Sequence, residues 1–266
     1  MRDADTVTSD AALLADTVRE AGALALSLFR TDLKTWTKGA SSPVSEADIT
    51  VNDLIEARLV GARPDYGWLS EESAENTARL ERPFTWVVDP IDGTRAYLNH
   101  QHDWSVSVAL VQDDGRPVLG AVFAPADQQF YFATRNGGAT LNDAVTGVAA
   151  GSALDLARMA GPKPLVERLE SAATGTASHP RIGSLALRLC RVADGGIDAA
   201  FAGGRSRDWD LAAADLIVHE AGGKMTALTG EPLVYNRADV THGLLVAAGH
   251  ARHQRIVDHF RSHPVF

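Results

Sequence analysis

The stretch that most constrains the fold is residues 85–94, Thr-Trp-Val-Val-Asp-Pro-Ile-Asp-Gly-Thr. Residues 85–88 are β-branched or aromatic, which is typical of a buried strand. Asp89 therefore lies at a strand end, because the proline after it cannot extend the ladder and Gly93 permits a backbone turn. The turn brings Asp89 and Asp92 to one point. Buried carboxylates so close together repel each other, so the pair must share a proton or a cation.

We interpret this pair as a cation site. Hard divalent ions such as Mg²⁺ prefer carboxylate and carbonyl oxygens, and the Ile91 carbonyl between the two acids offers a third ligand. The backbone N–H groups of Gly93 and Thr94 open a short segment beside this site, where they can bind an anion. A metal next to an oxyanion cradle predicts phosphate chemistry.

Two other interpretations of the stretch exist. Asp, Pro and Gly are ordinary turn residues, so Asp89 and Asp92 could simply cap a turn, and this alternative stays open. In phosphatases that form an aspartyl phosphate, one residue separates the nucleophilic aspartate from the acid aspartate. Here Pro90 and Ile91 both intervene, and the different spacing argues against that mechanism.

The composition of the chain limits its partners and its compartment. A net charge of −9 over 266 residues argues against nucleic acid or an anionic membrane as the main partner. The single cysteine, Cys190, excludes an internal disulfide and lies in an apolar helical run, which predicts a buried thiol. The first ten residues are acidic and polar, and no apolar run has membrane-spanning length. We therefore expect a cytoplasmic protein.

Apolar periodicity organises the first half of the chain. Residues 11–29 place apolar side chains at steps of three and four, which predicts an amphipathic helix. Residues 34–43 are polar and irregular and predict a loop. A capping-box pattern at residues 45–48 predicts the start of a second helix. Alternating apolar residues between 105 and 132 then predict an antiparallel meander, so two helices should precede a sheet.

The composition changes to small residues near 142–152, which is the best position for a boundary. We therefore predict an N-terminal α+β half, residues 1–145, that carries most of the metal ligands. Residues 146–266 form a C-terminal α/β half with the loops that determine substrate specificity. This half includes a helix that begins with Trp-Asp-Leu at 209–211 and is stopped by two glycines at 222–223.

Three further acids lie at the ends of predicted elements. Asp48 belongs to the capping box, Glu71 follows the short strand candidate 66–69, and Asp210 opens a helix. Adjacent residues on a strand point to opposite faces, so only one of Glu71 and Glu72 can face the metal, and we choose Glu71. Helix capping alone can explain Asp48 and Asp210. Independent caps need not converge, however, whereas metal ligands must.

These motifs together resemble the inositol monophosphatase superfamily of Mg²⁺-dependent, lithium-sensitive phosphatases. The resemblance covers nearly the whole chain and rests on three motifs in order: two glutamates at 71–72, the stretch 86–94, and residues 209–223. It implies an α+β fold, a layered α-β-α-β-α sandwich of the inositol monophosphatase and fructose-1,6-bisphosphatase type. It also implies a homodimer and an active site with ligands from both halves.

The resemblance further implies a set of metal ligands for two to three Mg²⁺ ions. One metal would be held by Glu71, Asp89 and the Ile91 carbonyl. A second would be held by Asp89, Asp92 and Asp210, so Asp89 would bridge the two. A weaker third ion would use Glu71 and water, which places Glu71 among the catalytic residues as well.

The remaining catalytic roles also follow from the resemblance. Thr94 and Asp48 would orient the attacking water, and the N–H groups of Gly93 and Thr94 would hold the phosphate. A metal-activated water can then attack phosphorus in line, without a covalent intermediate.

Substrate choice depends on the residues before Asp210. Inositol monophosphatases that resemble this chain carry an acid seven positions before that aspartate, where this chain has Gly203, followed by Arg205 and Arg207. Losing an acid and gaining two arginines favour a substrate with a second anionic group. Lys38 is a further candidate phosphate contact. All three basic side chains can equally be solvated, since exposed charges contribute little.

Other details are similar to the CysQ-type 3'(2'),5'-bisphosphate nucleotidases, which remove the 3'-phosphate of 3'-phosphoadenosine 5'-phosphate. They are Ser42-Pro43-Val44, Asp103-Trp104-Ser105, Ile182-Gly183-Ser184 and Pro232-Leu233-Val234-Tyr235-Asn236. The chain departs from that group at residues 159–162, where Met-Ala-Gly-Pro replaces a Ser-Arg-Ser-His-like turn.

We therefore expect a Mg²⁺-dependent bisphosphate nucleotidase. The first alternative is an inositol-1-monophosphatase or another sugar or amino-alcohol phosphatase, for example one that acts on histidinol phosphate. An alternative from a different class is a metal-binding regulatory module without catalysis. The complete set of acids together with Thr94 argues against that module, because a protein that only binds metal has no use for a residue that orients water.

Overall fold

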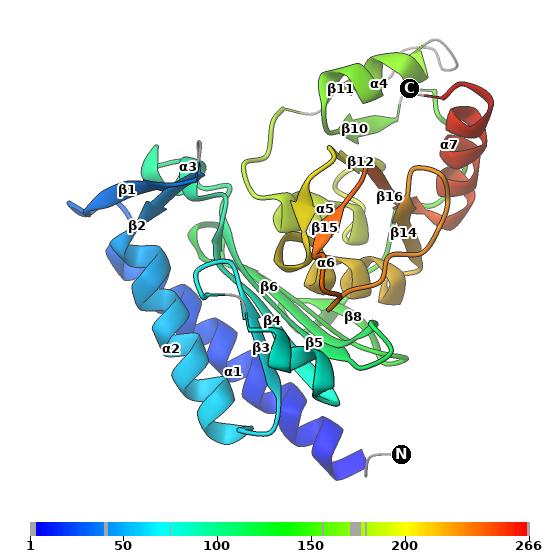
Figure 1. Ribbon diagram of the computed structural model, residues 1–266. Coiled ribbons are helices and arrows are strands. Elements are labelled where there is room, and N and C mark those ends of the chain that lie inside the picture. The colour runs from blue at the N-terminus through cyan, green and yellow to red at the C-terminus, as the bar shows by residue number, and fades with distance from the viewer. Residues whose placement is uncertain are drawn as a thin grey trace.

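The computed structural model describes residues 4–39, 42–74, 76–155, 157–170, 177–178 and 180–264. These residues build five layers in the order helix, sheet, helix, sheet, helix (Figure 1). The layered α+β sandwich predicted from the sequence is therefore confirmed.

The first outer layer consists of helices α1 (Ala4–Leu28) and α2 (Glu46–Ala62), which pack against each other and against one face of the larger sheet (Figure 1). The apolar positions of α1 recur at steps of four and three, and the side chains of Leu14, Val18 and Ala21 are fully buried. The amphipathic helix predicted for residues 11–29 is confirmed, with additional turns at its N-terminus.

The second layer is a sheet with the strand order β3-β4-β5-β6-β7-β8-β9. Its strands are β3 (Gly67–Ser70), β4 (Phe84–Asp92), β5 (Ser105–Gln112), β6 (Pro117–Ala124), β7 (Gln129–Thr134), β8 (Gly138–Leu141) and β9 (Ala144–Val145). Strand β3 pairs with β4 in parallel, and every later neighbour is antiparallel, so the predicted meander is confirmed.

The loop predicted for residues 34–43 is wrong for most of that range. Strands β1 (Thr35–Lys38) and β2 (Ser42–Ser45) pair as an antiparallel hairpin, and residues 40 and 41 lie outside the described part of the chain. All four residues of β1 are exposed. A strand without a buried face has no apolar alternation, and the sequence therefore gives no period-two signal.

The remaining three layers belong mostly to the second half of the chain (Figure 1). The middle layer holds α5 (Leu185–Ala193) and α6 (Asp208–Glu220). The second sheet has the order β11-β10-β12-β16-β14 and is covered outside by α4 (Lys163–Glu170) and α7 (His250–Ser262). Its strands are β10 (Arg158–Ala160), β11 (Ala177–Ser178), β12 (Ala199–Ala202), β14 (Gly223–Ala227) and β16 (Leu245–Gly249).

Strand alternation divides the interior into three apolar cores: one under α1 and α2, one between the two sheets around the middle helices, and one under α4 and α7. On β4, Trp86 and Val88 pack toward α1 and α2, whereas Val87 between them belongs to the central core. On β16, Leu245 faces the central core and Val246 faces α4 and α7. The middle helices are therefore buried on two sides and are fixed by both sheets.

Several shorter elements complete the fold. They are α3 (Thr94–Leu98), the 3₁₀ segments η1 (Thr77–Glu81) and η2 (Pro125–Asp127), and the paired strands β13 (Ser206–Arg207) and β15 (Thr241–His242). Cys190 is a free and buried thiol, as predicted. Among the described residues, no helix combines the length and apolar character needed to cross a membrane. The central core draws side chains from both sides of residue 145, and the division at that residue stays a prediction.

The contact between β6 and α6 predicts the effect of enlarging Gly120. A Cβ atom at this position would lie 2.8 Å from the Ala213 carbonyl oxygen, so Gly120→Ala must push α6 away from the sheet. We expect a loss of about 1–3 kcal/mol in the free energy of unfolding, measured by urea denaturation. The matched control is Gly61→Ala in α2, where a Cβ meets nothing within 4 Å and stability should stay equal or rise. Equal stability of Gly120→Ala and the parent would contradict this packing.

Candidate active site

An irregularity at the end of β4 turns two aspartates to the same side. In the pairing of β4 with β5, Asp89 lies opposite Ser107 and Asp92 lies opposite Ser105. Three steps along β4 thus match two steps along β5, which is the mark of a β-bulge. Residues three apart on a regular strand point to opposite faces, and the extra residue in the bulge puts both acids on one face.

The turn after Asp92 depends on glycine for two reasons. Gly93 has a φ of 92°, in the left-handed region that side chains disfavour. A Cβ atom there would also lie 3.0 Å from the backbone nitrogen of Ser184 and 3.3 Å from the Asp103 carbonyl oxygen. Thr94 then begins the short helix α3, as the sequence motif predicted.

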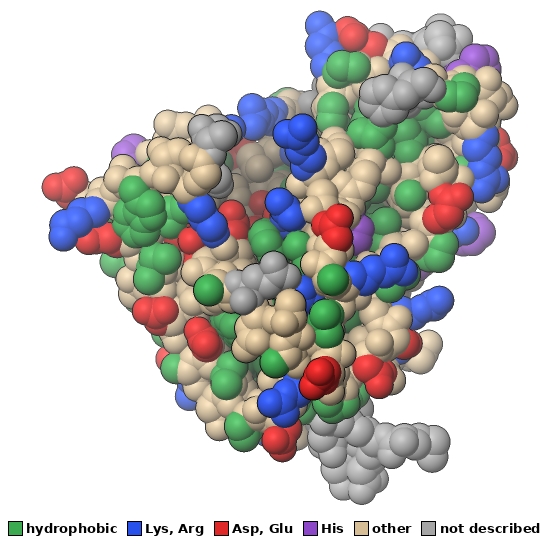
Figure 2. Space-filling view, in the orientation of Figure 1, with side chains coloured by type: hydrophobic (Ala, Val, Ile, Leu, Met, Phe, Trp, Pro, Cys, Tyr) green, Lys and Arg blue, Asp and Glu red, His purple; other side chains and the backbone are tan. Residues whose placement is uncertain are grey.

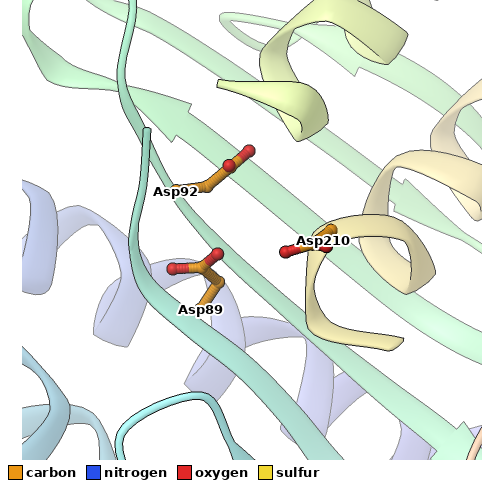
Figure 3. Close-up of side chains that lie close together, drawn as sticks. All are labelled: Asp89, Asp92 and Asp210. Atoms are coloured by element: carbon orange, nitrogen blue, oxygen red, sulfur yellow. The ribbon is translucent and has the colours of Figure 1, made fainter. Parts of the chain in front are cut away.

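The third aspartate comes from the other half of the chain. Asp210 lies in the first turn of α6, and one carboxylate oxygen from each of Asp89, Asp92 and Asp210 lies within 4.8 Å of the other two. Figure 3 shows the three side chains facing a common space between the end of β4 and the start of α6. Acids separated by more than a hundred residues therefore converge, as expected of metal ligands.

Protein hydrogen bonds hold each of the three carboxylates through a single oxygen. Oδ2 of Asp92 accepts bonds from Ser184 Oγ and from the Ala186 N–H, both at 2.6 Å. Oδ2 of Asp210 accepts the Arg207 N–H at 2.7 Å. Oδ1 of Asp89 accepts the N–H two residues later at 3.1 Å. Asp210 is thus both a helix cap and a member of the cluster, so the two interpretations of this residue are compatible.

Thr94 and Asp48 form a second polar unit beside the cluster. Asp48 is buried in the first turn of α2, where its Oδ2 accepts the Ser45 N–H at 2.8 Å and the Ser45 hydroxyl at 2.6 Å. Its Oδ1 lies 3.1 Å from Thr94 Oγ1, which also lies 3.0 Å from the Ile91 carbonyl oxygen. The hydrogen bonds from Ser45 therefore orient the Asp48 carboxylate, and its second oxygen faces the Thr94 hydroxyl.

The two glutamates after β3 have different surroundings. Glu71 lines the same cavity as the three aspartates, although it lies outside their close cluster. Glu72 Oε2 lies 3.5 Å from Lys38 Nζ, and the same ammonium group donates a hydrogen bond to the Glu71 carbonyl oxygen. The contacts of Lys38 in the described residues are thus with the glutamate pair on the rim of the site.

The cluster occupies one end of a cavity of about 870 Å³, also lined by Ile91, Gly93 and Thr94. Burial raises the pKa of Glu71 to about 7, with the neighbouring charge of Glu72 adding to the effect. Burial likewise raises the pKa of Asp89 and of Asp210 well above the usual range for aspartate, and the other acids of the site raise both further. Buried carboxylate oxygens with uncompensated charge suit a hard divalent cation.

The arginines chosen from the sequence do not lie on this cavity. Arg207 lines an adjoining space of about 470 Å³ together with Lys38, and its guanidinium donates to Thr241 Oγ1 at 2.7 Å. Arg205 lines neither space.

Two other arginines, Arg95 and Arg181, line the main cavity, and neither was predicted from the sequence as a site residue. A signal for them existed, since Arg95 directly follows the metal-loop motif and Arg181 directly precedes Ile182-Gly183-Ser184.

Comparison with known proteins identifies this arrangement. The sequence pattern of the inositol monophosphatase family matches residues 6–264. The chain belongs to the inositol monophosphatase family. Members of this family are metal-dependent phosphatases, so the predicted family and enzyme class are confirmed.

Relatives within the family carry different activities in their names. The chain is 38% identical over 212 residues to the inositol-1-monophosphatase of Rhizobium meliloti, covering 75% of this chain and 77% of the relative. It is 34% identical over 226 residues to the histidinol-phosphatase of Mycobacterium tuberculosis, covering 80% of this chain and 85% of the relative. It is 32% identical over 213 residues to the 3'(2'),5'-bisphosphate nucleotidase CysQ of Aggregatibacter actinomycetemcomitans, covering 76% of this chain and 78% of the relative.

A solved structure of the extragenic suppressor protein suhB from Bartonella henselae superposes with a TM-score of 0.81 at 26% identity, covering 94% of this chain and 97% of that one. The three enzyme names above agree on hydrolysis of a small phosphate ester and differ in the alcohol that carries the phosphate.

The raised pKa values predict how pH and metal affect stability. A carboxyl pKa above its unfolded value of about 4.3 means that the folded state binds the proton more tightly. The stability contributed by Glu71 is therefore complete below about pH 4 and is lost as the pH rises through about 7. In EDTA we expect a melting temperature at least about 5 °C lower at pH 8 than at pH 5, and Mg²⁺ should restore it at pH 8.

The Asp89→Asn variant is the matched control for this measurement. It removes one buried charge at nearly constant volume. The decrease of the melting temperature with rising pH should therefore be smaller than in the parent, and so should the increase on adding Mg²⁺. A melting temperature in EDTA that is independent of pH would contradict the electrostatic description of the site.

Proposed function

We propose that the protein is a Mg²⁺-dependent phosphomonoesterase that hydrolyses 3'(2'),5'-bisphosphate nucleotides, converting 3'-phosphoadenosine 5'-phosphate to AMP and phosphate. The observation that carries the phosphatase activity is the convergence of Asp89, Asp92 and Asp210 beside the Thr94–Asp48 pair. The three aspartates supply oxygen ligands for cations. The Thr94–Asp48 pair supplies the hydroxyl that orients water.

The donor set suits a site for two to three Mg²⁺ ions, with Glu71 and the Ile91 carbonyl as further ligands. The carbonyl oxygen lies near the Thr94 hydroxyl and has a second lone pair for a metal. Bound divalent cations would neutralise the phosphate charge and lower the pKa of a coordinated water. A solved structure of an inositol monophosphatase/NADP phosphatase is described as complexed with NADP and Ca²⁺, which supports divalent-cation binding by this fold.

Thr94 and Asp48 form a hydrogen-bonded pair in which the threonine hydroxyl is the donor and the carboxylate is the acceptor. When the Thr94 hydroxyl donates to Oδ1 of Asp48, its lone pairs remain to accept a hydrogen bond from water in the cavity. The water is then oriented with a lone pair toward phosphorus, while Gly93 and Thr94 line the place where the phosphate oxygens lie.

Two features support a bisphosphorylated nucleotide as the substrate. The resemblance to inositol monophosphatases implies an acid for the sugar hydroxyls at position 203, where this chain has glycine. Two arginines also line the cavity. An identity of 38% to an inositol-1-monophosphatase favours inositol 1-phosphate as the second candidate, and histidinol phosphate follows from the histidinol-phosphatase relative. Lithium sensitivity, a homodimer and a cytoplasmic location are expected from the resemblance and stay predictions.

The substrate is tested by measuring phosphate release with Mg²⁺ from 3'-phosphoadenosine 5'-phosphate, inositol 1-phosphate and histidinol phosphate in parallel. We expect kcat/KM for the nucleotide to exceed the others by about a hundredfold, which corresponds to roughly 2.7 kcal/mol of differential transition-state binding. Asp89→Asn should lower every rate by orders of magnitude. A preference for inositol 1-phosphate would contradict the nucleotide as substrate and would still agree with the proposed phosphatase activity.

The role of Thr94 distinguishes an enzyme from a metal-binding module. Thr94→Val removes the hydroxyl at nearly constant shape, so kcat should fall at least about 100-fold while Mg²⁺ affinity, followed by calorimetry, changes little. Thr94→Ser keeps the hydroxyl and should retain most of the activity. Unchanged phosphate release by Thr94→Val would refute the proposed role of this residue.

A further inference from the structure

The position of the reacting phosphate follows from the two spaces around the acids. Asp89, Asp92, Gly93 and Thr94 line the main cavity, and none of them lines the adjoining space that contains Arg207. The phosphate that is hydrolysed must lie against the full cluster, so it lies in the main cavity. The rest of the substrate therefore extends along the walls of that cavity.

The wall beyond the metal cluster is built by two segments far apart in sequence. A Cβ atom at Gly183 would lie 2.6 Å from Ala96 Cβ and 3.0 Å from the Asp103 carbonyl oxygen, so the segment before α5 packs directly on α3. The Ser184 N–H also donates to that carbonyl oxygen at 2.8 Å. This contact brings the neighbours Arg95 and Arg181 to the same wall of the cavity.

The charge on this wall favours an anion. Arg95 and Arg181 both line the cavity with exposed side chains, and Asp103 is the only carboxylate beside them among the described lining residues away from the metal cluster. Oδ2 of Asp103 accepts the Gly183 N–H, which fixes the segment that carries Arg181. Two guanidinium groups against one carboxylate leave a net positive charge, in a chain whose net charge is −9.

A half-buried arginine also holds this segment in place. Arg188 on α5 donates to the Ile182 carbonyl oxygen at 3.0 Å and to the Phe201 carbonyl oxygen at 3.1 Å. It fixes the backbone next to Arg181. Figure 2 shows Lys and Arg side chains beside Asp and Glu side chains along the hollow between the two parts of the molecule.

The basic residues of the adjoining space lie away from the place of the reacting phosphate. Lys38 and Arg207 line that space, whereas Asp89 and Asp92 do not. An anion held there would be separated from the aspartates at the end of β4.

We propose that Arg95 and Arg181 form a subsite for a second anionic group of the substrate, the second phosphate of a bisphosphorylated nucleotide or polyol. This assignment rests on phosphatase activity in the main cavity and not on the identity of the alcohol. Guanidinium groups bind phosphate through paired hydrogen bonds, so the subsite selects bisphosphates over the matching monophosphates.

The test uses substrate pairs that differ only by the second phosphate. One pair is 3'-phosphoadenosine 5'-phosphate and adenosine 3'-monophosphate, and the other is inositol 1,4-bisphosphate and inositol 1-phosphate. We expect the bisphosphate to have the higher kcat/KM in at least one pair, by about tenfold or more. Arg181→Gln and Arg95→Gln should each lower that ratio several-fold, mainly through KM.

Two further variants give the comparison its controls. Arg58→Gln, on the exposed face of α2 where this arginine pairs with Glu20, should leave the ratio as in the parent. Arg207→Gln should change both members of a pair by the same factor. Two outcomes would overturn the proposed subsite. One is a ratio of kcat/KM for bisphosphate to monophosphate near one in the parent for both pairs. The other is a ratio that falls in Arg207→Gln and not in Arg181→Gln.

Failure of the proposed activity is distinguished by a binding measurement. If no compound releases phosphate, the proposed function fails, and calorimetric titration of the same four compounds with Ca²⁺ in place of Mg²⁺ still tests the subsite. Tighter binding of the bisphosphates that is lost in Arg95→Gln and Arg181→Gln supports the subsite. Equal affinity for bisphosphate and monophosphate contradicts it.

Discussion

Repulsion between buried carboxylates is the interaction on which the rest of this structure depends. One carboxylate oxygen from each of Asp89, Asp92 and Asp210 lies within 4.8 Å of the other two, and Asp89 and Asp92 are buried, so charges of like sign are costly there. The layered packing of sheets and helices holds the acids in place against this repulsion. A bulge on β4 aligns two of the acids, and a helix fixed between both sheets supplies the third. In the proposed function, bound cations compensate the negative charge that the packing leaves unpaired.

The same carboxylates also connect the two halves of the chain. Asp92, at the end of a strand in the larger sheet, accepts hydrogen bonds from Ser184 and Ala186 at the start of α5. A member of the acidic cluster thus caps a helix of the other half. Ser107 Oγ donates to the Trp209 carbonyl oxygen at 3.3 Å, next to Asp210. The side chains of the acidic cluster and its neighbours therefore also take part in the contact between the two halves.

Much of this could be predicted from the sequence wherever burial imposes a pattern. Strand β4, helix α1 and the meander have one apolar face or are wholly apolar, and their periodicity is visible in the chain. Strand β1 of the β1–β2 hairpin is exposed throughout and has no such pattern, so the sequence does not predict it. The acids were recognised because Pro90 and Gly93 mark an irregular strand end. Arg95 and Arg181 were not, because their proximity depends on the contact between Gly183 and Ala96, which no spacing in the sequence reveals.

The placement of α6 has a consequence for the choice of ion. This helix is packed between two sheets, and its first turn carries Asp210, while Asp89 and Asp92 lie on β4, which is paired on both sides within the larger sheet. The backbones that carry these three acids therefore have little freedom to move apart. An ion with longer bonds and a larger coordination number must be accommodated by side-chain rotation and by water rather than by expansion of the cage. In the proposed metal site, ion selectivity is thus a property of the layered packing as much as of the carboxylates.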